Sequence, residues 1–516
     1  MDGNQHKEHP KPRENLKQRA YLNSVTSVLD YGARIVTNFV VTPFLVSGLG
    51  STLFGVWNVL GQFTSYTNIA DIKVTQVLKW AIAKDRDTTS EETLREYVTA
   101  TFLLLMLILP FILMLGAVVV WFAPQITGVG EEFVNTVRIT AGLLVLALVV
   151  NKVFDIFESV LRGMNLSFKR IGVRAAVTII GGILQIAVIF LGFGLIGLAL
   201  VQVFIMLSMG ITIYVIMKKH VPWFGWGEVN LKRTVSFSKI SGWFVGSTGT
   251  QILLLNTDKV LLGYLAGPML VTQYVITKYL ANAVHGGVRN IIQGVFPGIG
   301  KLYGNRQHDK LLEARKHVML FTWQFSVVIG AVIILFNESF ISLWIGEDEY
   351  AGQFVNFLIL LSVVQYLFVQ NDGVIIDTTL ELSQKVYMGL IASIISIALM
   401  SILIPRYEII GLCISLIIGR AVISLGYPWI VYLKTEQSLT IRDVPIRLII
   451  TMSLIWGVAY WIEPFVNLDN WITLIAMIFI FLIIITPVAF FSGIDRSNRK
   501  EIITHLKKIA PLKGDR

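Results

Sequence analysis

Four polar side chains follow one face of an otherwise apolar segment near the middle of the chain: Lys278, Asn282, His285 and Arg289. Spacings of four, three and four residues place all of them on one side of a helix, over ~16 Å at 1.5 Å per residue. The surrounding segment, 271–296, is apolar enough to cross a bilayer. Cations at membrane depth are costly unless they face protein, water or an anion. The stripe therefore predicts either an anionic ligand or acidic partner helices.

This stripe contains no acidic residue, so Lys278, His285 and Arg289 cannot neutralise one another. Their partners must come from another helix or from a ligand. We interpret Lys278 and Arg289 as cavity cations that bind an anionic substrate, and we expect Asn282 to line the same cavity. His285 is a candidate for substrate binding or for coupling to a proton, although a histidine satisfied by packing explains it equally well.

Other apolar segments also place polar side chains on one face, and we expect these faces to line a shared cavity. The further candidates are Arg34 as a cation, Asn58, Gln62, Ser247, Gln251 and Asp30 as polar lining, and Lys152, Asp155 and Asp258 as charged groups. The charged groups have two interpretations. Asp30 lies four residues before Arg34, and Lys152 lies three before Asp155, so each pair can be a structural ion pair within one helix. Alternatively, these acids, including Asp258, couple transport to H⁺ or Na⁺.

The composition is that of a membrane protein. The 516 residues are 54% hydrophobic and 15% charged, with a mean hydropathy of +0.69, whereas soluble domains carry about 25% charged residues. The net charge of +10 comes from short loops between apolar segments, which indicates topology and not nucleic-acid binding. Cys413 is the only cysteine, which excludes a disulfide framework and any cysteine-based metal site. No signal-peptide pattern precedes the first apolar segment, so we expect that segment to remain in the mature protein.

Fourteen apolar segments are long enough to be transmembrane helices, from 21–46 to 470–492. Alternate connections are rich in Lys and Arg, whereas the loops between them contain Arg406 and no other basic residue. By the positive-inside rule, this predicts a multi-pass protein of the cytoplasmic (inner) membrane with both termini in the cytoplasm. The outer loops are too short for a catalytic domain, and we expect no enzymatic activity, no cofactor and no metal site.

Two sequence matches indicate an internal repeat. LGSTLFGVW at 49–57 resembles AGPMLVTQY at 266–274, an offset of 217, and FGLIGL at 193–198 resembles YEIIGL at 407–412, an offset of 214. Similar offsets in the same direction predict two parallel six-helix lobes with a binding site where they meet. The predicted parts are a cytoplasmic tail at 1–20, an N-lobe at 21–217, a cytoplasmic loop at 218–238, a C-lobe at 239–433, two further helices at 434–492 and a basic cytoplasmic tail at 493–516.

Five motifs carry a resemblance to a known family. They are FGVW at 54–57 followed by IADI at 69–72, TDKVLLG at 257–263, FP at 296–297 followed by Tyr303, LWIG at 343–346, and IPRYEIIG at 404–411. In this order they resemble the polysaccharide (O-antigen type) flippases of the multidrug/oligosaccharidyl-lipid/polysaccharide (MOP) exporter superfamily. Lys73 departs from the pattern, because the family usually has a glycine there. The resemblance implies an all-α integral membrane fold with two MATE-like six-helix lobes and two extra C-terminal helices.

The resemblance also implies a function. The expected substrate is an oligosaccharide linked to a lipid of the undecaprenyl-pyrophosphate type, moved from the cytoplasmic to the outer leaflet by alternating access for O-antigen, lipopolysaccharide, capsule or exopolysaccharide synthesis. H⁺ or Na⁺ and the polymerase and glycosyltransferases of the same pathway are expected partners. Arg289 and Lys278 suit a pyrophosphate through charge-assisted hydrogen bonds. Two alternatives stay open: a cation-coupled drug or metabolite antiporter of the same superfamily, and a non-transporting assembly protein whose charges are only structural pairs.

Overall fold

Helices are the regular structure throughout the part of the chain that this computed structural model describes, namely residues 16–67, 74–86, 88–166, 168–229, 231–379, 382–436, 446–496 and 498–500. The first half contains α1 (Leu16–Thr67), α2 (Val74–Asp85), α3 (Glu91–Thr127), η2 (Glu131–Phe133), α4 (Val134–Gly163), α5 (Phe168–Phe190) and α6 (Gly194–His220). The second half contains α7 (Leu231–Ala266), α8 (Pro268–Thr277), α9 (Tyr279–Gly304), α10 (His308–Trp344), η3 (Glu347–Glu349), α11 (Gln353–Thr378), α12 (Ser383–Lys434), α13 (Ile446–Ile462), η5 (Glu463–Phe465) and α14 (Trp471–Gly493).

Ten of the described segments are long and apolar enough to cross a membrane. Two of the helices, α1 and α12, each join two helices across a non-helical residue: Gly50 (φ 72°, ψ 162°) in α1 and Glu408 (φ 48°, ψ −124°) in α12. The apolar segment expected at 271–296 is likewise made of two helices, α8 and α9, which meet at Lys278. The all-helical membrane fold is thus confirmed, and the number of fourteen spans stays a prediction.

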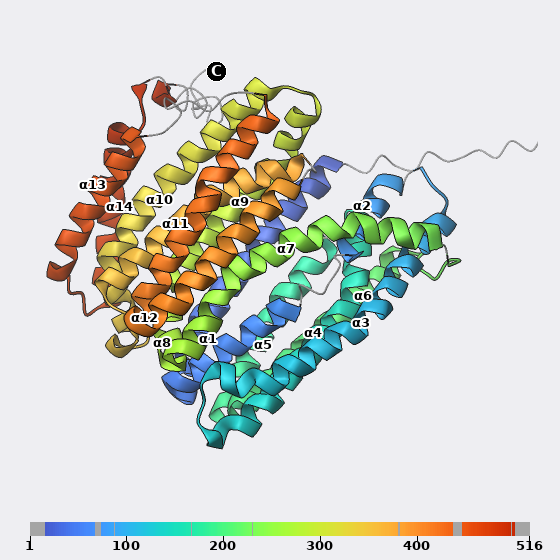
Figure 1. The fold of residues 1–516 in the computed structure, drawn as a ribbon, viewed down its shortest axis with the longest axis horizontal. Coiled ribbons are helices and arrows are strands. Elements are labelled where there is room, and N and C mark those ends of the chain that lie inside the picture. The colour runs from blue at the N-terminus through green and yellow to red at the C-terminus, as the bar shows by residue number, and fades with distance from the viewer. Residues whose placement is uncertain are drawn as a thin grey trace, which may run out of the picture.

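The helices form two groups that meet at one end (Figure 1). Within the N-lobe, α1 packs against α5 and α4 packs against α6; within the C-lobe, α12 packs against α7 and α11. The two extra helices, α13 and α14, pack on α10 at the outside of the C-lobe. The lobes converge where the α1 kink, α8 and the middle of α12 lie, and they spread apart toward the end that holds the C-terminus.

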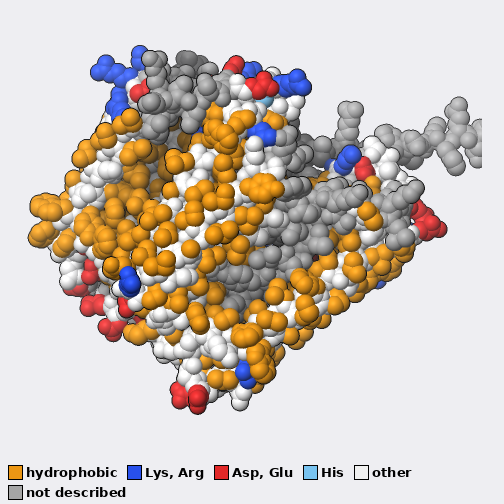
Figure 2. Space-filling view, viewed as in Figure 1, with side chains coloured by type: hydrophobic (Ala, Val, Ile, Leu, Met, Phe, Trp, Pro, Cys, Tyr) orange, Lys and Arg blue, Asp and Glu red, His pale blue; other side chains and the backbone are white. Residues whose placement is uncertain are grey.

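Charge is distributed unevenly between the two ends of the molecule. Figure 2 shows apolar side chains across the broad face and most Lys and Arg side chains, with some acidic ones among them, at the end where the lobes spread; at the end where the lobes converge, acidic groups outnumber basic ones. The acidic end includes η3, whose three residues are Glu347, Asp348 and Glu349. This asymmetry agrees with the predicted orientation, in which the converging end faces outward.

The hairpins matched by the repeat share an unusual backbone conformation. Gly50 and Gly267, 217 residues apart, both have positive φ, at 72° and 97°. Gly194 and Glu408, 214 residues apart, also both have positive φ, at 51° and 48°. Since few residues other than glycine adopt this region, its recurrence at both matched positions supports the internal repeat.

Contacts between the lobes follow the same symmetry. The Thr272 hydroxyl donates to the Ser51 carbonyl at 2.5 Å, and a Cβ added to Gly55 would lie 1.8 Å from the Pro268 carbonyl oxygen. The 217-residue offset makes Ser51 equivalent to Pro268, and Gly55 equivalent to Thr272. The two contacts therefore join equivalent positions of the two lobes, as expected around a two-fold axis. Together they hold the lobes tightly closed at the predicted outer end.

Candidate functional site

The central polar stripe is divided between two environments. Lys278 lies at the junction of α8 and α9, whereas Asn282, His285 and Arg289 lie on α9. Asn282 and Arg289 are exposed, and His285 is partly buried. The stripe is therefore a real helical face, as the spacing predicts, although its two outermost cations meet different neighbours.

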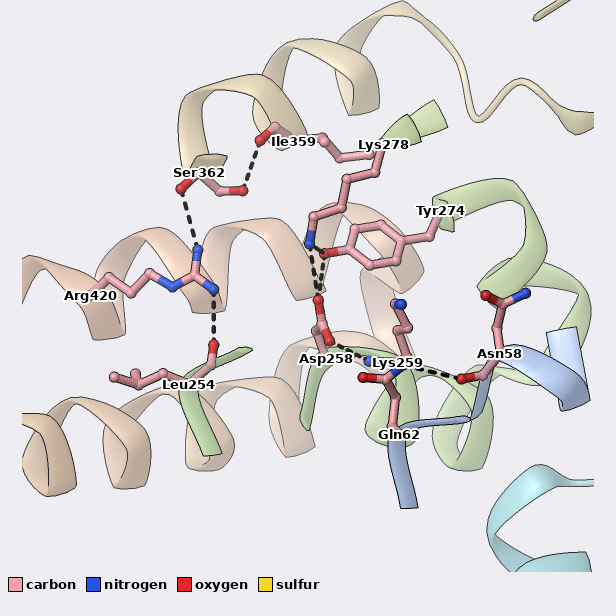
Figure 3. Close-up of polar contacts among 10 residues, drawn as sticks. All are labelled: Asn58, Gln62, Leu254, Asp258, Lys259, Tyr274, Lys278, Ile359, Ser362 and Arg420. Atoms are coloured by element: carbon pink, nitrogen blue, oxygen red, sulfur yellow. Dashed lines mark hydrogen bonds and ion pairs between the residues drawn. The ribbon is translucent and has the colours of Figure 1, made fainter. Parts of the chain in front are cut away.

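Lys278 belongs to a buried charged cluster within the C-lobe (Figure 3). Its ammonium lies 3.1 Å from the Asp258 carboxylate, which is 1% exposed. The same carboxylate accepts hydrogen bonds from the Tyr274 hydroxyl and from the Lys259 backbone N–H, both at 2.8 Å. Lys278 thus has a counter-ion 20 residues away in the sequence, on the neighbouring helix α7. The arrangement matches the structural interpretation of Asp258 and Lys278 more closely than the ligand-binding one.

Arg289 lies in a cavity of about 480 Å³ inside the C-lobe, which we call the C-lobe cavity. Its lining comes from α7, α9, α11 and α12 and consists of Gln251, Leu254, Arg289, Tyr366, Val369, Gln370, Gly373, Val374, Asp377, Lys385, Ile423 and Tyr427. The structure thereby brings the predicted residues Gln251 and Arg289 together. His285 lies beside the cavity, because its Nε2 is 3.0 Å from Oε1 of the lining residue Gln370.

The other two charged residues that line the C-lobe cavity, Lys385 and Asp377, pair with each other and not with Arg289. Lys385 lies 2.5 Å from the Asp377 carboxylate and also donates to the Gly373 carbonyl at 3.0 Å, so these two charges compensate each other. Among the residues that the structure describes, Arg289 has neither an ion pair nor a hydrogen bond. An unpaired guanidinium with five donors, facing a protein cavity, is a natural site for an anion.

A second arginine, Arg420, lies next to the lining residue Tyr366 and adds positive charge near this cavity. Arg420 is 3% exposed and donates to the Leu254 carbonyl at 2.9 Å and to the Ser362 carbonyl at 3.2 Å (Figure 3). Its guanidinium lies 5.1 Å from the ring centre of Tyr366, which lines the cavity. Within the described chain, Arg420 has no carboxylate partner at ion-pair distance, so its charge adds to that of Arg289.

Arg34 and Asp30 form the ion pair that their spacing allows, with 3.6 Å between the charged groups. Asp30 is 6% exposed and also lies 3.5 Å from Arg174 of α5. Sequence reasoning missed Arg174, because no spacing rule connects residues on different helices. With two arginines around one carboxylate, this group has a net positive charge, and Arg34 remains about half exposed.

Asn58 and Gln62 lie in a second cavity, of about 360 Å³, which we call the N-lobe cavity. It lies between α1, α4 and α6 and is lined by Trp57, Asn58, Gly61, Gln62, Leu144, Ala147, Leu148, Asn151, Gln202 and Met206. The Asn58 amide donates to the Phe54 carbonyl at 2.9 Å. The Gln62 amide donates to the Asn58 carbonyl at 3.3 Å (Figure 3). Of the predicted residues, Asn58 and Gln62 thus line a cavity in the N-lobe, and Gln251 and Arg289 line a cavity in the C-lobe.

Lys152 and Asp155 are not among the residues that line either cavity. Lys152 is 5% exposed on α4, and Asp155 accepts a hydrogen bond from Asn151 at 3.4 Å. Ser247 lies outside the residues whose side chains the structure describes. No group of three His, Cys, Asp or Glu side chains that could hold a metal ion occurs in the described ranges.

Comparisons with known proteins give the family and the fold. A family model described as "Polysaccharide biosynthesis protein" matches residues 49–350, more than half of the chain. None of the curated proteins matches the chain. The motif-based resemblance is confirmed by the family match together with the structural neighbours.

Solved structures of flippases and transporters share the architecture. The "Lipid II flippase MurJ, inward closed conformation" has a TM-score of 0.66 at 14% identity and covers 91% of this chain and 99% of that one. The inward-facing conformation of a multidrug resistance MATE family transporter of the MOP superfamily has a TM-score of 0.63 at 16% identity, covering 79% and 96%. A point mutant of the Vibrio cholerae MATE transporter VcmN has a TM-score of 0.57 at 14% identity, covering 82% and 96%. At these identities the likeness shows the fold, and it confirms the MOP architecture.

Proposed function

The chain belongs to the polysaccharide biosynthesis protein family, and from this premise we propose that it is a flippase for a lipid-linked oligosaccharide. It moves a glycan carried on a polyprenyl (pyro)phosphate of the undecaprenyl type from the cytoplasmic to the outer leaflet of the cytoplasmic membrane. The coarser statement, that it is a multi-pass MOP-superfamily flippase or transporter, follows from its family, its apolar helices and its fold. Delivery of the glycan for O-antigen, capsule or exopolysaccharide synthesis is part of the proposal.

The observation that carries the proposal is the unpaired Arg289 in the C-lobe cavity. A phosphate or pyrophosphate brings negative charge and several acceptor oxygens, and a guanidinium binds such groups through charge-assisted, bidentate hydrogen bonds. Arg420 adds positive charge beside the cavity, because its guanidinium lies 5.1 Å from the ring centre of the lining residue Tyr366. Lys278 contributes less directly, because Asp258 already neutralises it. The cationic site that we propose is thus centred on Arg289.

The arrangement of the lobes supports transport by alternating access. The lobes are held together at the predicted outer end by the Ser51–Thr272 hydrogen bond and the Gly55–Pro268 contact, and they spread toward the predicted cytoplasmic end (Figure 1). A substrate headgroup would enter from the cytoplasm, and opening of the outer contacts would release it on the other side. Asp30, together with its partners Arg34 and Arg174, is a candidate for coupling this change to H⁺ or Na⁺.

The cavity charges argue against a drug antiporter that binds organic cations. Such a substrate needs an available carboxylate, and Asp377, the acidic residue among the lining residues that the structure describes, is paired with Lys385. The fold alone does not separate the two functions, since MATE transporters share it. The free cation therefore favours an anionic substrate.

Translocation of a fluorescent polyprenyl-pyrophosphate–glycan in proteoliposomes tests the proposed function. We expect Arg289→Gln to lower the rate at least about tenfold, the scale for losing one charge-assisted interaction, and Arg289→Lys to keep part of it. Lys301→Gln is the matched control, because Lys301 is an exposed cation in the last turn of the same helix, outside the cavity. Wild-type rates in Arg289→Gln would remove the cationic site from the mechanism. Absence of translocation by the wild-type protein would favour the assembly-protein alternative.

A further inference from the structure

The N-lobe cavity differs chemically from the C-lobe cavity, because none of its lining residues in the described part of the chain is ionisable. Its polar groups are the carboxamides of Asn58, Gln62, Asn151 and Gln202, which come from three helices, α1, α4 and α6. Trp57 supplies a broad aromatic surface, and the rest of the lining is aliphatic or glycine. The two lobes therefore present one neutral and one positively charged site.

Most hydrogen-bonding capacity of these carboxamides is unused. Asn58, Gln62 and Asn151 each donate one hydrogen bond to their own helix, at 2.9, 3.3 and 3.4 Å. Across the described residues, their side-chain amide oxygens accept no hydrogen bond, and the Gln202 amide forms none at all. Each carboxamide can donate two hydrogen bonds and accept two, so the cavity can both give and receive several.

This chemistry excludes three other kinds of ligand. Among the described lining residues, a phosphate would find no cation and an organic cation would find no carboxylate. The neighbouring Asp155 carboxylate accepts a hydrogen bond from Asn151 and does not itself line the cavity. A lipid chain would remove the carboxamides from water without replacing their hydrogen bonds, which is unfavourable. A neutral ligand rich in hydroxyl groups, with apolar C–H faces between them, fits all the groups present.

We propose that the N-lobe cavity binds a neutral pyranose residue of the glycan, while the C-lobe cavity binds the phosphate end of the same substrate. This inference rests on the proposed function and adds a division of tasks between the lobes. The sugar hydroxyls exchange hydrogen bonds with the carboxamides, and one C–H face of the ring packs against the indole of Trp57. Selectivity for the glycan then resides mainly in the N-lobe.

The size of the cavity and the position of Gly61 suit this role. The volume of about 360 Å³ falls within the range of small-molecule sites, roughly 300–1,000 Å³. Gly61 lines the cavity, and a Cβ added there would meet no other atom within 4 Å. A leucine at this position would therefore project into the cavity without displacing the protein at Cβ.

The experiment measures binding of two lipids to the purified full-length protein in detergent. One is polyprenyl pyrophosphate carrying a single N-acetylhexosamine, and the other is the same polyprenyl pyrophosphate without sugar. The variants are Gly61→Leu, which fills the cavity, and Gln202→Leu, which removes a carboxamide. Gly142→Leu is the matched control, because a Cβ at Gly142 also meets nothing within 4 Å and Gly142 does not line the cavity. Arg289→Gln reports on the phosphate site.

We expect Gly61→Leu and Gln202→Leu to raise the Kd of the sugar-bearing lipid about tenfold and to leave that of the sugar-free lipid within about twofold. Arg289→Gln should raise both Kd values, and Gly142→Leu neither. Equal binding of the two lipids by wild type, or equal weakening of both by Gly61→Leu, would overturn the sugar site alone. Failure of wild type to bind either lipid would overturn the proposed function and the sugar site with it.

Discussion

Lys278 and Arg289 lie on the same helical face, yet their surroundings give them different roles. Lys278 is compensated by a carboxylate that is 1% exposed and that also accepts hydrogen bonds from Tyr274 and the Lys259 backbone. Arg289 is exposed to a cavity and has no counter-ion among the described residues. Burial with a partner makes the first a structural charge, and exposure without a partner makes the second available to a ligand.

Loss of Lys278 is expected to destabilise the protein. Lys278→Met leaves the buried Asp258 carboxylate without its cation, which costs about 3–5 kcal/mol where one member of a buried pair is removed. Asp258→Asn in the same protein removes the orphan charge, so the double variant should recover most of that loss. Thermal unfolding of the purified protein in detergent measures both. A single variant as stable as wild type would show that the pair is not needed for the fold.

Side-chain partners were the part of the site that could be predicted least. The spacing of Asp30 and Arg34 predicts their ion pair, since both lie on one helix. Arg174, which shares the same carboxylate, comes from α5 and follows no local pattern. Asp258 is likewise brought to Lys278 only by the packing of α7 on α8. Local periodicity identifies which residues face a cavity, whereas tertiary packing decides which of them remain free.

At the scale of elements, the two hairpins matched at an offset of 214 residues share the same turn conformation. Gly194 begins α6 with a φ of 51°, and the equivalent position in α12 is Glu408, with a φ of 48°. A Cβ added to the equivalent glycines Gly197 and Gly411 would lie within 2.5 Å of neighbouring atoms in both hairpins. Both turns are therefore tight, and Glu408 is a non-glycine residue in a conformation that favours glycine.

Replacement of Glu408 by glycine should stabilise the protein. The strain of a side chain in this region is of order 1–3 kcal/mol, and the added flexibility of glycine in the unfolded chain offsets up to about 1 kcal/mol of it. Glu408 is exposed, so few contacts are lost. A rise in the midpoint of thermal unfolding, with unchanged translocation, is the expected result. Gly194→Glu is the reverse change at the equivalent turn and should lower the midpoint; equal midpoints for wild type and Glu408→Gly would contradict the strain.

Hydropathy predicts where helices lie more reliably than where they break. The apolar runs around both hairpins are visible in the sequence, yet α1 and α12 each continue through the turn with one non-helical residue. The interruption at Lys278 between α8 and α9 has no glycine or proline to mark it. Such breaks are set by packing between helices, which a one-dimensional pattern does not contain.

At the scale of the whole molecule, the lobes form a closed outer end and spread at the other end (Figure 1). The closure is made by symmetry-equivalent residues, because Ser51 meets Thr272 and Gly55 meets Pro268. The absence of a side chain on Gly55 permits this close approach. If transport proceeds by alternating access, these contacts must separate in every cycle.

A covalent link across the outer contact should therefore stop transport. Ser51→Cys with Thr272→Cys, in a Cys413→Ala background, places one thiol on each lobe beside the outer contact, where the Thr272 hydroxyl lies 2.5 Å from the Ser51 backbone carbonyl. Because the Ser51 hydroxyl itself donates to Glu349, the two thiols need a crosslinker to join them. A short thiol-specific crosslinker that a reductant can cleave should lower translocation of the lipid-linked glycan at least about tenfold, because the outer end can no longer open. Reduction should restore the rate, and each single cysteine variant should be unaffected by the crosslinker. Full transport by the linked protein would mean that the lobes do not separate at this end, and alternating access between them would be wrong.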